Sequence, residues 1–219
     1  ATACGSSLVL MIGRVAVSGA ERTGADEVRR AAGVEPGEPL IAVDTGAVAR
    51  RVERLPWVAS AKVVRGWPST LEIEVTERVP VAVVQLTEDR AAVVDAEGWV
   101  LAIEHRAPDE EVPEGERLVL TGISGRVAEG EQLDRAARDA VDLAVALEER
   151  LPGVVASVST DLEAELVAGG VVRFGSTEDL DAKVTALKTV LEEVDTTCME
   201  VLDVRVPGSP ALTRNQRCP

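Results

Sequence analysis

A regular alternation of apolar and polar residues runs through residues 55–83 and predicts two β-strands. Ala59, Ala61 and Val63 carry the apolar positions of the first run, and Leu71, Ile73 and Val75 those of the second. Side chains on successive strand residues point to opposite faces, so each strand is apolar on one face and polar on the other. Proline lacks the N–H that a strand ladder needs, which places Pro68 and Pro80 at strand margins. The stretch therefore reads as two strands joined by a tight turn.

The residues before this stretch favour one strand followed by two short helices. Residues 14–19 read as a strand that ends at a glycine. Thr23, with Asp26 three residues later, has the spacing of a helix-capping box, and Gly33 would end that helix. A second helix would begin at Asp44 or Thr45. Residues 13–79 thus form a compact module in the order strand, helix, helix, strand, strand.

After Pro80 the pattern predicts a larger mixed β-sheet domain over residues 80–207, with two longer amphipathic helices. Apolar residues recur every three or four positions from 129 to 149, and again from 180 to 194. Short strand-like runs surround both helices, and the last run covers residues 201–206. Residues 208–219 are expected to be a flexible tail. The fold class is therefore α+β, a small module followed by a mixed sheet.

Residues 1–12 contain no charged side chain. As a helix at about 1.5 Å per residue they would reach only about 18 Å, short of the roughly 30 Å hydrocarbon core of a membrane. The segment is either an ordinary apolar stretch or the outer end of a transmembrane helix. The sequence alone does not decide between these two interpretations.

Charge and composition exclude several classes of function. The chain has 219 residues and a formal charge of −15, whereas nucleic-acid binding requires a basic surface. Aromatic residues make up only 2% of it. Of the three cysteines, Cys198 and Cys218 could form a disulfide in an oxidising compartment, and their spacing does not suggest metal binding.

No catalytic constellation is evident in the sequence. It contains no Gly-x-Gly-x-x-Gly motif, no phosphate-binding loop and no Gly-x-Ser-x-Gly elbow. His105 is the single histidine and lies next to an acidic stretch, which does not support a Ser-His-Asp triad. We predict that the protein is not an enzyme, with no catalytic residues, no cofactor, no metal site and no small-molecule substrate.

An ordered set of short motifs nevertheless resembles the FtsQ/DivIB family of bacterial cell-division proteins, in its actinobacterial form. The motifs lie at residues 15–19, 55–63, 67–71, 77–82, 94–98, 172–175 (with Lys183) and 202–207. The resemblance implies that residues 13–79 are a POTRA domain and residues 80–207 the family's β domain. It further implies that residues 1–12 end a single transmembrane helix, with both domains outside the cytoplasm at the division septum.

The resemblance also implies partners and binding residues. Family members are non-enzymatic scaffolds that bind FtsB/DivIC-like and FtsL-like proteins and act through them on FtsW and FtsI. The last strand of the β domain accepts a partner strand, which would place the contact at Asp203, Val204, Arg205 and Val206. Proteobacterial members have an aromatic residue where this chain has Val206. The hinge between the domains would lie at Glu77, Arg78, Val79 and Pro80.

Two alternatives belong to other functional classes. One is a POTRA chaperone or secretion module of an outer-membrane assembly machine. The other is an acidic extracytoplasmic hydrolase, because paired carboxylates are common in so acidic a chain.

Overall fold

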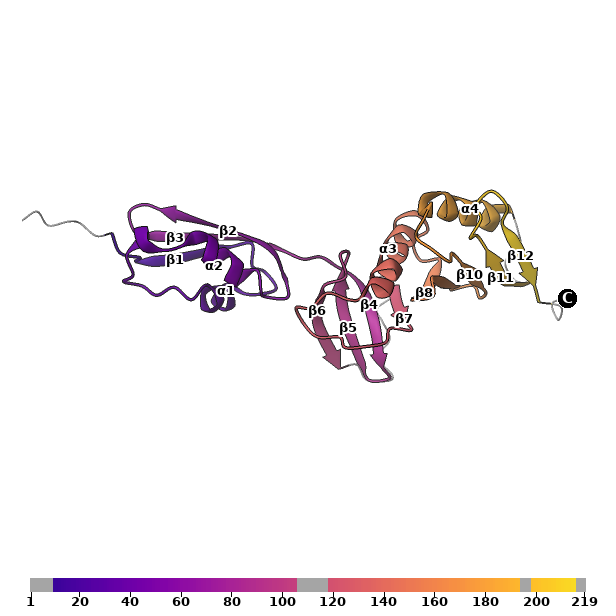
Figure 1. The fold of residues 1–219 in the computed structure, drawn as a ribbon, viewed down its shortest axis with the longest axis horizontal. Coiled ribbons are helices and arrows are strands. Elements are labelled where there is room, and N and C mark those ends of the chain that lie inside the picture. Colours follow the sequence, from indigo (N-terminus) through magenta and orange to yellow (C-terminus); the bar gives the residue numbers. More distant parts are fainter. Residues whose placement is uncertain (1–9, 106–117, 194–197, 216–219) are drawn as a thin grey trace, which may run out of the picture. The chain divides into compact units, whose positions relative to one another are not determined.

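The computed structural model describes residues 10–105, 118–193 and 198–215. The chain divides into two compact units, residues 1–78 and residues 79–219, and each has its own hydrophobic core (Figure 1). The structure confirms the predicted α+β class, with a small β-α-α-β-β module followed by a mixed sheet that carries two longer helices.

The first unit is a three-stranded sheet covered by two short helices. Its elements are β1 (Arg14–Ser18), α1 (Ala25–Ala32), the 3-10 turn η1 (Leu40–Ala42), α2 (Thr45–Val52), β2 (Val58–Gly66) and β3 (Thr70–Glu77). The strand order is β1-β3-β2, with β1 parallel and β2 antiparallel to the central β3. The period-two residues of β3, Leu71, Ile73 and Val75, are buried against the helices, as the alternation predicted.

The start of this unit differs from the sequence-based expectation. The described residues at the end of the expected membrane segment are extended rather than helical. Met11 forms a β-bridge with Pro39, and Ile12 is fully buried in the core of the first unit. The backbone N–H of Ile12 donates to the carbonyl of Glu38 at 2.8 Å. Residues 1–9 lie outside the described residues.

The second unit is a nine-stranded sheet with strand order β12-β11-β10-β9-β8-β7-β4-β5-β6. Its strands are β4 (Pro80–Thr87), β5 (Arg90–Asp95), β6 (Val100–His105), β7 (Leu118–Thr121), β8 (Val155–Ser159), β9 (Glu163–Leu166), β10 (Val171–Arg173), β11 (Met199–Asp203) and β12 (Ala211–Arg214). Helix α3 (Arg135–Arg150) packs on the centre of the sheet, and α4 (Leu180–Glu193) follows β10. None of the helices in the described part of the chain is long and apolar enough to cross a membrane.

Three expectations for this unit differ from the structure. The helix expected from residue 129 begins only after Asp134, whose side chain accepts a hydrogen bond from the N–H of Ala137 and caps it. The tail expected to be flexible contains β12, which pairs antiparallel with β11. The strand expected over residues 201–206 ends at Asp203.

A buried lysine fixes the start of α4. The Lys183 side chain is only 3% exposed. Its ammonium group donates to the carbonyls of Phe174 and Ser176, at 3.0 and 2.9 Å, and to the Ser176 hydroxyl at 3.0 Å. All three of its N–H donors therefore have acceptors, as a buried ammonium group requires. This network ties α4 to the loop that follows β10.

Candidate protein-interaction site

The terminal strand β12 offers one open side. It pairs with β11 in the register Asp203–Ala211, Leu202–Leu212 and Val201–Thr213. Just beyond it, the N–H of Asn215 donates to the Cys198 carbonyl at 3.0 Å, toward β11. Because backbone groups alternate along a strand, the N–H and C=O groups of Leu212 and Arg214 point away from β11. Within the described residues, nothing pairs with that side.

The other end of the same sheet is covered by the chain itself. Residues 129–132 run beside β6, where the N–H of Val100 donates to the carbonyl of Glu131 at 3.0 Å. The N–H of Ile103 donates to the Glu129 carboxylate at 2.9 Å, and Trp99 forms a bridge with Gln132. The strand edge at β6 is therefore largely satisfied. Such covering is a common protection of sheet edges against other chains.

Side chains also engage the two edges of the first unit. The Arg29 guanidinium donates to the Val15 carbonyl on β1 at 3.2 Å. The Glu53 carboxylate accepts from the N–H of Ala61 on β2 at 3.2 Å. Each of these two edges thus has one side-chain hydrogen bond, whereas no side chain among the described residues is seen to bond the outward groups of β12.

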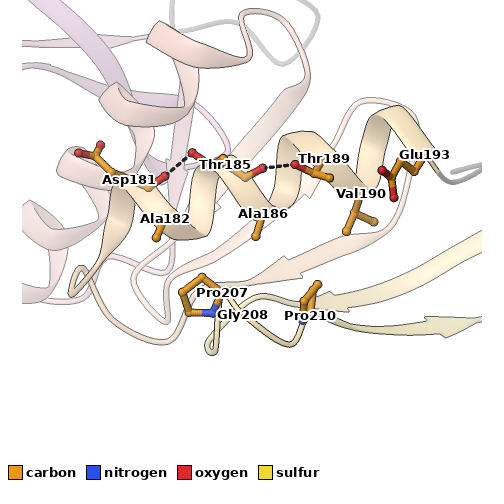
Figure 2. Close-up of a pocket in the computed structure, with 10 residues that line it drawn as sticks. All are labelled: Asp181, Ala182, Thr185, Ala186, Thr189, Val190, Glu193, Pro207, Gly208 and Pro210. Atoms are coloured by element: carbon orange, nitrogen blue, oxygen red, sulfur yellow. Dashed lines mark hydrogen bonds between the residues drawn. The ribbon is translucent and has the colours of Figure 1, made fainter.

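An open groove lies between α4 and the turn that leads into β12 (Figure 2). It has a volume of about 700 Å³. Ala182, Ala186 and Val190 are spaced four residues apart on α4 and point toward Pro207 and Pro210 across the groove. These small side chains leave an apolar channel, and it borders the start of the open strand.

The residues predicted to bind a partner have different surroundings from those expected. Asp203 pairs with Arg173 on β10 and with Ala211 on β12, so it lies inside the sheet. Val204 is fully buried, and its N–H donates to the Arg173 carbonyl at 3.0 Å. Val206 is 64% exposed. β12 lies outside β11 and pairs with Asp203, so the edge of the sheet is β12 and not the strand that contains Asp203. Whether Asp203, Val204, Arg205 and Val206 contact a partner stays a prediction.

Arg205 and Asp203 bind each other. The Arg205 Nε lies 3.0 and 2.9 Å from the two Asp203 carboxylate oxygens, and Nη2 lies 2.6 Å from Oδ2. The hydrogen bonds from the Arg205 side chain and backbone N–H lower the pKa of Asp203. Gly175 lies under the Arg205 stem, since a Cβ there would approach Cδ to 2.8 Å. The pair holds the chain in position as it leaves β11.

The expected interdomain hinge residues divide between the two units. Glu77 ends β3, and the N–H of Arg78 donates to the Trp57 carbonyl at 2.8 Å within the first unit. Val79 is exposed, and Pro80 begins β4 opposite Asp95. Whether this segment bends stays a prediction.

Glu77 also supports the loop before α1. Its carboxylate accepts from the N–H groups of Thr23 and Arg22, at 2.7 and 3.0 Å. Burial alone would raise the pKa of Glu77, but these backbone hydrogen bonds outweigh burial and lower it. The capping box expected at Thr23 is wrong, because the helix is capped at Gly24 without a side-chain bond.

We expect Glu77→Gln to lower the free energy of unfolding of the first unit by about 1 kcal/mol at pH 7, since charged acceptors make stronger hydrogen bonds. Because folding lowers this pKa, the stabilisation is complete above the ordinary value of 4.5 and is lost as the pH falls below it. Urea titrations of both proteins between pH 3 and 7 would measure this. Glu74→Gln on the same strand, in an exposed pair, is the matched control. A pH-independent difference would contradict the assignment.

The described residues give little indication of metal or redox chemistry. The described residues hold no group of three or more metal-ligating side chains. Cys198 is disulfide-bonded. The predicted partner, Cys218, lies outside the described residues, as does Cys4. His105 ends β6, beside a segment that the structure does not describe.

Sequence reasoning missed β12 and the α4 groove. Ala211–Arg214 is too short to show a periodicity, and it follows a Pro-Gly-Ser-Pro turn. Ala182 and Ala186 gave a usable signal, because two alanines four residues apart on an amphipathic helix can mark a shallow face.

Comparison with known proteins assigns each unit to a known domain family. The family described as "POTRA domain, FtsQ-type" matches residues 10–78, and "Cell division protein FtsQ/DivIB, C-terminal" matches residues 82–205. Similar proteins include Cell division protein FtsQ of Streptomyces collinus, 36% identical over 92% of this chain and 77% of that protein. FtsQ of Streptomyces coelicolor is 34% identical over 90% of this chain and 76% of that protein. FtsQ of Corynebacterium glutamicum is 30% identical over 84% of this chain and 80% of that protein. The chain, a POTRA domain followed by the family's C-terminal domain, belongs to the FtsQ/DivIB family of cell-division proteins.

Proposed function

We propose that this protein is a membrane-anchored scaffold of the division machinery that captures a partner by strand addition at β12. In this proposal a single transmembrane segment holds both units outside the cytoplasm at the septum. The scaffold connects early division proteins to septal peptidoglycan synthesis, and it catalyses no reaction itself. Its partners are FtsB/DivIC-like and FtsL-like proteins, through which it acts on FtsW and FtsI. Membership of the FtsQ/DivIB family supports the role in division.

The observation that carries the proposal is the open side of β12. The outward N–H and C=O groups of Leu212 and Arg214 offer donors and acceptors to an incoming strand. The opposite edge of the same sheet, at β6, is engaged by the backbone of residues 129–132, and β1 and β2 each have one side-chain hydrogen bond, which favours β12 as the acceptor. This location differs from the one expected at residues 203–206, which no observation tests as a contact.

The groove beside α4 supports the same location. A strand that adds to β12 starts next to the channel lined by Ala186, Val190 and Pro207. Apolar side chains next to the partner's strand could fill this channel and displace water from it. Backbone hydrogen bonds would then supply the strand alignment, and side chains in the groove would supply the specificity.

Amide hydrogen exchange tests the proposal. When the extracytoplasmic segment of the FtsB/DivIC-like protein of the same organism is added, we expect slowed exchange at the N–H groups of Leu212 and Arg214. The N–H of Thr213 already faces β11 and should change less, which provides an internal control. Protection confined to β6 or to the first unit, with no change at β12, would contradict the proposal.

A further inference from the structure

One end of the POTRA unit carries exposed apolar side chains from three separate segments. At this end β1 begins, β2 finishes and β3 begins, because Arg14 and Gly66 both pair with Thr70 (Figure 1). The N–H groups of Gly13 and Arg14 also donate to the Ser69 carbonyl, at 2.8 and 3.2 Å.

Three large apolar side chains are exposed here, Trp67 by 60%, Ile41 by 73% and Met11 by 46%. The backbone holds their segments together. Met11 is bridged to Pro39, and the N–H of Leu40 donates to the Leu10 carbonyl at 2.8 Å. We call Met11, Ile41 and Trp67 the apolar tip.

Arg65 fastens the third segment. Its guanidinium donates to the carbonyls of Leu40 and Val43, at 3.1 and 2.7 Å, and so joins the end of β2 to the turn that carries Ile41. Trp67 is two residues further along the chain. These hydrogen bonds hold the backbone of the tip residues in place, so the tip is not part of a free loop. Exposed apolar groups of this kind mark contact surfaces.

The distribution of charge indicates which surface the tip fits. Residues 10–78 contain ten Lys or Arg and ten Asp or Glu, so the whole formal charge of −15 falls on residues 79–219. At the tip itself, Arg14 and Arg65 are balanced by Glu38 and Glu72. An anionic bilayer repels an acidic domain but does not repel a neutral one. The POTRA unit is therefore the part of this chain that can approach a lipid surface closely.

We propose that the apolar tip rests in the interfacial layer of the phospholipid bilayer, with Trp67 as its anchor. Tryptophan favours this layer because its ring is apolar and its N–H remains able to hydrogen-bond. The inference rests on the membrane anchoring in the proposed function, which brings the chain out of the membrane next to Met11. The contact fixes the orientation of the POTRA unit on the membrane, and it specifies lipid rather than a second copy of the chain.

The test tethers the 219-residue chain to vesicles through a histidine tag on either end. The vesicles contain phosphatidylcholine, phosphatidylglycerol, a nickel-chelating lipid and a lipid brominated near its headgroup, which quenches tryptophan at that depth. With the N-terminal tag, we expect the loss of about a third of the total emission, the share of one tryptophan in three. Trp67→Phe with the same tag should show no such quenching above the background of Trp57 and Trp99.

Controls separate the outcomes. Tethering through the C-terminal tag no longer holds the tip at the lipid, so any quenching of Trp67 there comes from the affinity of the tip itself. Equal quenching of wild type and Trp67→Phe, with either tag, would overturn the inference. So would a Trp67 emission shift that depends on protein concentration and not on brominated lipid, because that indicates self-association. Since the tag supplies the tether, failure here would leave capture at β12, measured in solution, unaffected.

Discussion

Arg214→Pro is expected to weaken capture of the FtsB/DivIC-like partner about 30-fold, or about 2 kcal/mol. Proline removes the outward N–H of residue 214 and places its ring where the partner strand would lie. The hydrogen bonds between β12 and β11 should persist, because Thr213 and Asn215 face β11 and Arg214 does not. Proline is tolerated on edge strands for the same reason. Binding would be measured by calorimetry with the partner's extracytoplasmic segment.

The matched control is Arg214→Ala, which removes the same charge and side chain but keeps the N–H. It should bind within about threefold of wild type, since an exposed charge at the rim of an interface contributes little affinity. Circular dichroism and urea unfolding would show that both variants are folded. Equal losses in the two variants would point to a side-chain contact of Arg214 and would count against strand addition. Unchanged binding by a folded Arg214→Pro variant would exclude this edge.

Lys183→Met is expected to lower the free energy of unfolding of the second unit by about 2 kcal/mol. Methionine has a similar length, but it leaves the Phe174 and Ser176 carbonyls and the Ser176 hydroxyl without their donor. Removing a buried charge recovers some desolvation energy, which is why the expected loss is smaller than three separate hydrogen bonds would give. Because α4 lines the groove, capture of the partner should weaken as well.

Lys188→Met is the control on the same helix, where the side chain is exposed. It should change stability by less than about 0.5 kcal/mol. Urea unfolding followed at Trp99, in single-tryptophan variants, would report on the second unit separately from the POTRA unit. Equal stability of the two variants would show that the Lys183 network is not a structural support.

At residues 201–214 a prediction made from a local sequence pattern was wrong. The strand-like run expected at residues 201–206 corresponds to β11, but the strand ends at Asp203, and only one further hydrogen bond, from the N–H of Val204 to the Arg173 carbonyl, follows it. The same pattern cannot tell an edge strand from an inner one. That depends on whether another segment lies alongside, and here Ala211–Arg214 does. Four residues carry too little periodicity to announce a strand.

A similar limit applies to residues 129–134. Their helical spacing extends the pattern of α3, yet the backbone there pairs with β6, and the helix begins only after Asp134. A long-range contact with Val100 outweighed a local preference that is worth only fractions of a kcal/mol per residue. The capping box at Thr23 failed for a related reason, since its N–H is bound by Glu77 from the far end of the unit.

The sequence by itself determined the order of the elements, the α+β class and the family, because these follow from local periodicity, turn residues and the sequence of short motifs. It also predicted the buried face of β3, since a period of two leaves no choice of face once one side is apolar. Only the tertiary structure decided which edge of the sheet is open, where the groove beside α4 lies, and that three segments with exposed apolar side chains lie together at one end of the POTRA unit. Each of these is set by contacts between residues far apart in the chain, and no local pattern encodes them.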